Sequence, residues 1–221
     1  MSALVSIPFG ESELSGWLEE PAGEARAGLI VLQEWWGLVP HVKDVAGRFS
    51  GEGYLCLAPD LYHGRSTVEA EEAQHLMEGL DWPLALSEIK EAVGELRRRG
   101  CSKVGVVGFC MGGALSCLAS ATAGVEAAVA FYGFPPAPNP MDRNCPPTKV
   151  LFGEHEDFFS VADAEQWAAQ QRASGVMDTE VVVYPGAGHA FFNDTRPEAY
   201  HEASAADAWR RSLEHFARHL S

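Results

Sequence analysis

The sequence is poor in basic residues, with 16 Lys and Arg against 31 Asp and Glu, a net charge of −15. Binding of nucleic acid or of an anionic membrane surface needs a basic face, so this balance argues against both classes of partner. No apolar run approaches the roughly 20 residues that span a bilayer, and no N-terminal segment has the pattern of a secretory signal. We therefore expect a soluble, cytoplasmic protein.

The chain also lacks a paired-cysteine motif. Its five cysteines form an odd set without C-x-x-C spacing, which favours free thiols in a reducing cytoplasm. They are Cys56, Cys101, Cys110, Cys117 and Cys145.

Patterns that bind cofactors or metals are equally scarce. No glycine-rich loop has the dinucleotide or P-loop pattern. His215 and His219 have a spacing that can bind metal, but no third ligand is evident, so a solvated helix face is the preferred interpretation. We expect no cofactor and no metal.

What the sequence does contain is alternating strand and helix patterns, without repeats or linkers. A single α/β domain over residues 1–221 is expected, with a doubly wound, mostly parallel sheet preceded by an N-terminal antiparallel hairpin. The predicted strands cover residues 4–8, 14–19, 27–33, 54–58, 102–109, 125–132, 149–153 and 180–184. The predicted helices cover residues 41–51, 68–78, 84–99, 114–121, 160–173 and 197–219. Ligands bind such sheets at the carboxyl ends of the strands, so residues that directly follow strands are the candidates for a site.

The most informative stretch is Gly108-Phe109-Cys110-Met111-Gly112. It lies between an apolar strand and a helix, as in the nucleophile elbow G-x-Nuc-x-G of α/β hydrolases, with cysteine in place of serine. The sharp turn predicts a positive φ at Cys110 and small residues two positions to either side, and Gly113 would let the helix pack close to the strand. A helix N-terminus at Cys110 favours the thiolate. A small buried cysteine in a glycine-rich turn is the alternative interpretation of this motif taken alone.

Two further loops supply the partners that a thiol nucleophile needs. The order nucleophile, acid, histidine matches Cys110, Asp157 and His189, with His189 as the base and Asp157 as the residue that orients it. Glu154 or Glu156 could equally be the acid, and Asp157 could instead cap the helix over residues 160–173. The backbone N–H groups of Met111 and Trp35 are the expected oxyanion donors.

The sequence resembles the dienelactone hydrolase family, the α/β hydrolases with a cysteine nucleophile. The resemblance covers essentially the whole chain. It rests on residues 33–37 (QEWWG), 58–62 (APDLY), 108–113 (GFCMGG), 131–133 (FYG), 153–157 (GEHED) and 184–191 (YPGAGHAF). It implies an α/β-hydrolase fold, a Cys110–Asp157–His189 triad and no cofactor. It also implies that Glu34 interacts with the resting thiol and helps to activate it.

The sequence departs from the family where its namesake enzymes bind the substrate carboxylate. Those enzymes carry a serine directly after the histidine and an arginine three residues later, and here these positions are Ala190 and Asn193. Arg65 and Arg196 are the nearest cations by sequence that could replace the missing residues. The resemblance therefore supports the hydrolase mechanism better than it supports dienelactone as the substrate.

Aromatic residues near these loops predict a pocket suited to an ester, lactone or acyl group with apolar bulk. They are Trp35, Trp36, Tyr132, Phe158, Phe191 and Phe192. We expect hydrolysis of carboxylic ester or lactone bonds of a small molecule, by a monomer or weak homodimer. Thioester hydrolysis by the same triad is an alternative. A non-enzymatic alternative is a redox sensor or ligand-binding protein built on Cys110, although Cys117, seven residues on, is too far along the helix for a disulfide without rearrangement.

Overall fold

The structure is a computed structural model and describes residues 1–135, 145–156 and 158–221. Its strands form one eight-stranded sheet in the order β1-β2-β4-β3-β5-β6-β7-β8. The strands are β1 Ser2–Phe9, β2 Ser12–Glu19, β3 Gly28–Leu32, β4 Leu55–Pro59, β5 Val104–Phe109, β6 Ala127–Phe131, β7 Thr148–His155 and β8 Glu180–Gly188. The helices are α1 Pro40–Gly51, α2 Ala70–Glu78, α3 Trp82–Arg98, α4 Met111–Thr122, α5 Val161–Ala173 and α6 Glu202–His219.

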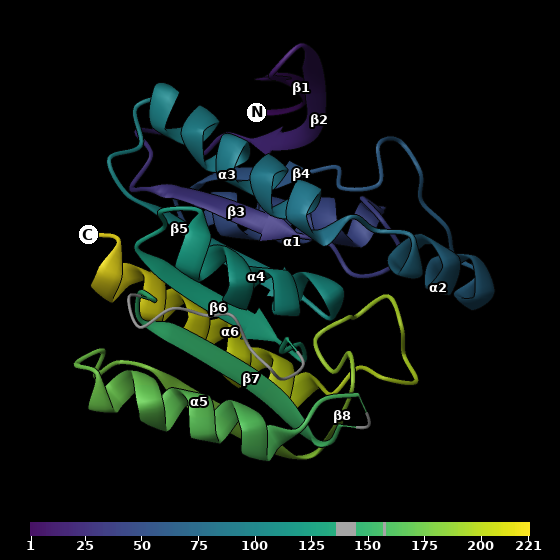
Figure 1. The fold of residues 1–221 in the computed structure, drawn as a ribbon, viewed down its shortest axis with the longest axis vertical. Coiled ribbons are helices and arrows are strands. Elements are labelled where there is room, and N and C mark those ends of the chain that lie inside the picture. The colour runs from purple at the N-terminus through teal and green to yellow at the C-terminus, as the bar shows by residue number, and fades with distance from the viewer. Residues whose placement is uncertain (136–144, 157) are drawn as a thin grey trace.

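Helices cover both faces of the sheet (Figure 1). Successive side chains of a strand point to opposite faces, so Leu29 and Val31 pack in one core with α1 and α6. Ile30 and Leu32 pack in the core on the other face, with α2, α3 and α4. Helix α5 covers that same face further along, against β7. Because both faces are buried, the central strands are continuously apolar, as the sequence pattern predicted.

The predicted fold class is confirmed, including its N-terminal hairpin. Strands β1 and β2 pair antiparallel from Ser2 with Glu19 to Phe9 with Ser12. Strand β2 also pairs antiparallel with β4, while every pairing from β4 through β8 is parallel. Within the described residues, no helix is both long enough and apolar enough to cross a bilayer.

Several predicted element boundaries differ from those of the structure. The last helix begins at Glu202 rather than at residue 197, and the ring of His201 accepts the hydrogen bond of the Ser204 amide at the start of this helix. Strands β7 and β8 each continue beyond the predicted ends because pairing resumes after an irregularity, where His155 lies opposite Gly188. Residues 185–188 are therefore strand rather than loop, and His189 follows directly after them.

Candidate active site

The turn between β5 and α4 has the conformation that a nucleophile elbow requires. Cys110 has φ 55° and ψ −117°, a left-handed conformation that non-glycine residues rarely adopt. A Cβ atom on Gly108 would lie 2.0 Å from the carbonyl oxygen of Gly112, and one on Gly112 would lie 2.5 Å from the carbonyl oxygen of Gln33. The predicted positive φ and the need for small neighbours are both confirmed.

Two further glycines allow the backbone around Cys110 to pack tightly. A Cβ on Gly113 would lie 2.6 Å from the carbonyl oxygen of Phe131, which explains how α4 packs so close to β6. A Cβ on Gly133 would lie 2.0 Å from the carbonyl oxygen of Cys110. The Cys110 amide also donates to the carbonyl of Phe131 at 3.0 Å. The position of the thiol is thus fixed by backbone contacts on several sides.

His189 lies between this thiol and a buried carboxylate. Its Nδ1 is 2.7 Å from Oε1 of Glu156, whose side chain is 1% exposed. Burial disfavours the charged form of His189, but side-chain hydrogen bonds to Cys110 and Glu156 outweigh it and raise the pKa of His189 to about 10. A thiol, an imidazole and a carboxylate are therefore connected in series.

The sequence analysis names three carboxylates that could be the acid in this series. Asp157, the predicted acid, lies outside the described residues. Glu154 is more than half exposed, and its Oε2 accepts a hydrogen bond from the Gly186 amide at 2.9 Å. Of the two glutamates that were left open as alternatives, Glu156 is the one in contact with His189.

Glu34 is buried beside the cavity that holds Cys110, in a site made by two polar side chains. Its Oε1 accepts from the Tyr132 hydroxyl at 2.9 Å and its Oε2 from Nδ2 of Asn193 at 2.8 Å. Burial and the neighbouring Glu34 carboxylate raise the pKa of Tyr132, so the hydroxyl stays protonated as a donor. Asn193 therefore binds Glu34, a role that the sequence interpretation did not assign to it.

A cavity of about 470 Å³ opens at the carboxyl ends of the strands and is lined by Cys110 and His189. Trp35, Trp36 and Phe158, which the sequence analysis expects in the pocket, lie in its wall, and so does Met111. The remaining lining residues are Glu34, Met77, Trp82, Ala114, Phe159, Ala190, Arg196 and Ala199.

Three of the predicted wall residues lie in the core instead. Phe192 is 1% exposed and stacks on Phe109. Phe191 is fully buried and packs against Phe131, Tyr132 and Tyr184. Tyr132 is also fully buried, and it lies behind Glu34. Met77 and Trp82 were missed because they come from α2 and α3, and nothing in a sequence pattern indicates that these helices reach the carboxyl end of β5.

The two arginines considered as carboxylate-binding residues differ in position. Arg196 lines the cavity, with its guanidinium 5.5 Å from the centre of the Trp36 ring, and it pairs with Glu198 at 2.9 Å. Arg65 is mostly exposed and pairs with Glu72 at 2.7 Å. Only the first of these arginines can meet a molecule bound beside Cys110.

Comparisons with known proteins agree with this geometry. The model of the Dienelactone hydrolase family matches residues 14–220. The chain belongs to the dienelactone hydrolase family. It is accordingly a hydrolase of the esterase type with an α/β-hydrolase fold.

Relatives and a solved structure in the family match over nearly the whole chain. "Protein usf" of Aquifex pyrophilus is 32% identical and covers 100% of both chains. A "Putative carboxymethylenebutenolidase" of Salmonella typhimurium is 31% identical over 99% of this chain and 87% of its own length. A crystal structure of a "Putative Dienelactone Hydrolase" from Klebsiella pneumoniae superposes with a TM-score of 0.87 at 28% identity, over 99% of both chains.

Proposed function

We propose that the protein hydrolyses carboxylic ester or lactone bonds through an acyl-enzyme formed on Cys110. One observation carries the proposal. An elbow cysteine, Cys110, lies in the wall of the same cavity as His189, whose raised pKa reflects interaction with that thiol and whose Nδ1 contacts the buried Glu156. Nucleophile, base and orienting acid in this arrangement are the requirements of nucleophilic acyl transfer.

The first half of the reaction forms a thioester. His189 holds the proton of Cys110, and a protonated ring beside the sulfur favours the nucleophilic thiolate. The sulfur attacks the acyl carbon, and the carbonyl oxygen becomes an oxyanion. As the tetrahedral intermediate collapses, the carbon–oxygen bond to the alcohol breaks and His189 gives its proton to the leaving oxygen.

The second half returns the enzyme to its starting state. His189, now neutral, takes a proton from a water molecule, and the resulting hydroxide attacks the thioester. Collapse releases the carboxylic acid and the cysteine sulfur. Met111 and Trp35 would supply the oxyanion donors: both line the cavity, and Met111 is the first residue of α4, where backbone amides lack an intrahelical partner.

The acid of this triad is Glu156 in our proposal, in place of Asp157. Glu156 Oε1 accepts the hydrogen bond from Nδ1–H of His189, which leaves Nε2 for the thiol and the substrate. The amide of Phe158 also points to this oxygen, at 3.4 Å. A carboxylate so fixed keeps the imidazole in the required tautomer.

Glu34 is proposed to act on the thiol rather than on the histidine. It lines the cavity beside Cys110, and Tyr132 and Asn193 fix both of its oxygens. A carboxylate in this position can take the proton of the resting thiol, in keeping with the thiol-activating role that the family resemblance implies.

The cavity supports substrates with apolar bulk. Trp35, Trp36, Met77 and Trp82 are among the apolar residues of its wall, and Arg196 is the one cationic lining residue in the described part of the chain besides the histidine. Its guanidinium already pairs with Glu198. We therefore propose neutral esters or lactones, with an acyl or alcohol group large enough to reach Trp82.

Thioester hydrolysis would proceed through the same steps. Comparing the kcat/KM for an acyl-thioester with that for the oxygen ester of the same acyl group distinguishes the two activities. The sensor alternative has less support. Cys117, the nearest cysteine in sequence, is fully buried on α4, and burial raises its pKa, so it is a poor resolving thiol.

The deciding experiment compares wild type with Cys110→Ala on p-nitrophenyl acetate, p-nitrophenyl butyrate and dienelactone. We expect turnover of both esters by wild type, with a burst of p-nitrophenol from acylation, and none above background by the variant. A variant that retains most of the activity would rule out Cys110 as the nucleophile.

A further inference from the structure

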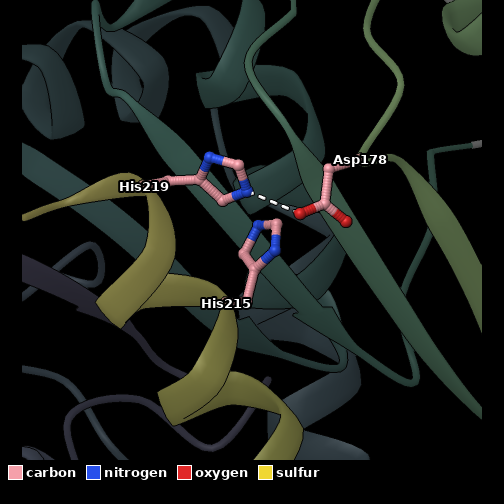
Figure 2. Close-up of side chains that lie close together, drawn as sticks. All are labelled: Asp178, His215 and His219. Carbon is pink, nitrogen blue, oxygen red and sulfur yellow. Dashed lines mark hydrogen bonds and ion pairs between the residues drawn. The ribbon is translucent and has the colours of Figure 1, made fainter.

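Three potential metal ligands lie close together in Figure 2. They lie at the end of the sheet where β8 begins, opposite to the end where Cys110 follows β5. His215 and His219 are four residues apart on α6, which places them on one face of that helix. Asp178 lies just before β8, whose other end leads to His189. Each of the three side chains offers one donor atom, and all three atoms lie within 4.8 Å of one another. The fold thus supplies the third ligand that was not evident from the sequence.

His215 presents a nitrogen that has no partner. The ring is buried, and its Nε2 lies 3.0 Å from the carbonyl oxygen of Pro147. A carbonyl oxygen can only accept, so Nε2 carries the hydrogen, and Nδ1 of the neutral ring has an open lone pair. That Nδ1 is buried without a hydrogen-bond partner. Histidines that bind metals usually donate their second ring N–H to a carbonyl or carboxylate, as here.

The other two ligands are already in contact and partly accessible. Nε2 of His219 is 2.7 Å from Oδ2 of Asp178, and both side chains are exposed by about a fifth to a quarter. Figure 2 shows the ring of His215 beside this contact, with both rings coming from α6. An ion can therefore enter from solvent without opening the fold.

The surrounding charges leave room for a divalent ion. Arg218 Nη1 contacts Asp178 Oδ2 at 2.8 Å, but its side chain is 66% exposed and can turn away into water. Lys149 pairs with Glu180, and its Nζ is 4.0 Å from Asp178 Oδ1. Arg211 Nη1 also lies 4.0 Å from Glu180 Oε1. The two carboxylates, Asp178 and Glu180, thus face three cations, and of these Arg218, the one in contact with the proposed ligand Asp178, can turn away into water.

We propose that His215 Nδ1, His219 and Asp178 bind Zn²⁺, with water in the fourth position. Two imidazoles and a carboxylate are a ligand set that zinc prefers, at about 2.0–2.2 Å from the ion. The donors are close enough that rotation of the side chains brings them to these distances. The ion would join α6 to the turn before β8, far from Cys110, so its role is in stability rather than in the hydrolysis.

The test is zinc binding by the metal-free full-length chain, measured by competition with a chromogenic chelator. All variants carry Cys110→Ala, because Cys110 and His189 together could bind zinc at the active site. The parent is compared with His219→Gln and Asp178→Asn, which alter partly exposed side chains, and with His75→Gln as a control on the exposed face of α2. Circular dichroism confirms that each variant is folded.

We expect the parent and His75→Gln to bind one Zn²⁺ per chain, and His219→Gln and Asp178→Asn to bind at least about tenfold more weakly. Zinc should also raise the melting temperature of the parent, but not that of His219→Gln. Absence of stoichiometric binding by the parent would overturn the proposal. So would equal affinities for all four proteins, which would place the zinc elsewhere.

Discussion

Nδ1 of His189 lies 2.7 Å from Oε1 of Glu156, and the glutamate side chain is almost completely buried. This contact predicts that Glu156→Gln is a severe catalytic lesion. Replacing the orienting acid of a triad by its amide leaves the shape but favours the wrong tautomer, at a loss of about 10⁴ in kcat. We expect Glu156→Gln to lose about a thousandfold or more on p-nitrophenyl butyrate. Asp157→Asn is the matched control and should lose less than about tenfold. The reverse order would identify Asp157 as the acid.

A second prediction concerns stability at alkaline pH. The folded-state pKa of His189 is about 10 against an ordinary value of 6.5, so the folded chain keeps a proton that the unfolded chain loses. The protonated His189 therefore contributes to the free energy of unfolding, and this contribution is fully present below about pH 6.5. It decreases by up to about 1.4 kcal/mol for each pH unit above that and is lost above about pH 10. Urea unfolding of wild type and His189→Gln should therefore show a stability difference that shrinks with rising pH. A difference independent of pH would contradict this interpretation.

A third prediction concerns the glycine opposite the nucleophile. A Cβ on Gly133 would lie 2.0 Å from the carbonyl oxygen of Cys110 and 2.8 Å from the amide of Ala114, and neither backbone atom can move without distorting the elbow. Gly133→Ala should destabilise the protein by about 3 kcal/mol or more and also reduce activity. Gly47→Ala, in α1 with open space around it, should instead be neutral or stabilise by up to about 1 kcal/mol. Denaturant unfolding of both variants measures the contrast.

A fourth prediction tests the site that holds Glu34. Tyr132→Phe removes only the hydroxyl that donates to Glu34 Oε1, in a residue that is fully buried. Leaving a buried carboxylate oxygen without its donor should cost about 1–3 kcal/mol of stability, and kcat/KM should fall because Glu34 is less firmly oriented. Both this variant and Glu34→Gln should also lower the rate at which iodoacetamide alkylates Cys110. The decrease should be larger in Glu34→Gln than in Tyr132→Phe. Unchanged alkylation in both variants would exclude a thiol-activating role for Glu34.

A fifth prediction concerns charge in the substrate. The side-chain amide of Asn193 donates its hydrogen bond to Glu34, so it is not available to a substrate carboxylate. Arg196 is paired with Glu198, so the cavity offers no unpaired cation among the residues described. The kcat/KM for p-nitrophenyl butyrate should equal or exceed that for the anionic dienelactone. A strong preference for the lactone would contradict this, and loss of that preference in Arg196→Gln would then identify the arginine responsible.

The sequence was sufficient to predict the parts of the site that depend on local backbone constraints. The elbow is an example. Glycine at positions 108, 112 and 113 indicates that the backbone approaches closely around Cys110, and a Cβ atom at any of these positions would clash with a backbone oxygen. The alternation of apolar strands with helices likewise predicted the fold class and the edge of the sheet where the site lies.

Contacts between distant elements could not be predicted in this way. Three carboxylates lie within four positions at the end of β7, and a pairing irregularity between β7 and β8 lies in the same stretch. No sequence pattern encodes that irregularity. In the same way, Asp178 reaches His215 and His219 only because β8 lies next to the last helix in space. Phe191 was misplaced because an aromatic residue beside a catalytic loop can equally fill the core below it.

The origin of the cavity wall has a consequence for how this enzyme can diversify. Cys110 and His189 follow strands of a rigid sheet, whereas Met77 and Trp82 come from the end of α2 and the start of α3, around the connection between these helices. Substitutions in that segment can reshape the space offered to a substrate without disturbing the reacting groups. Focused mutagenesis of these two positions is therefore a direct route to esterases of altered selectivity on an unchanged scaffold.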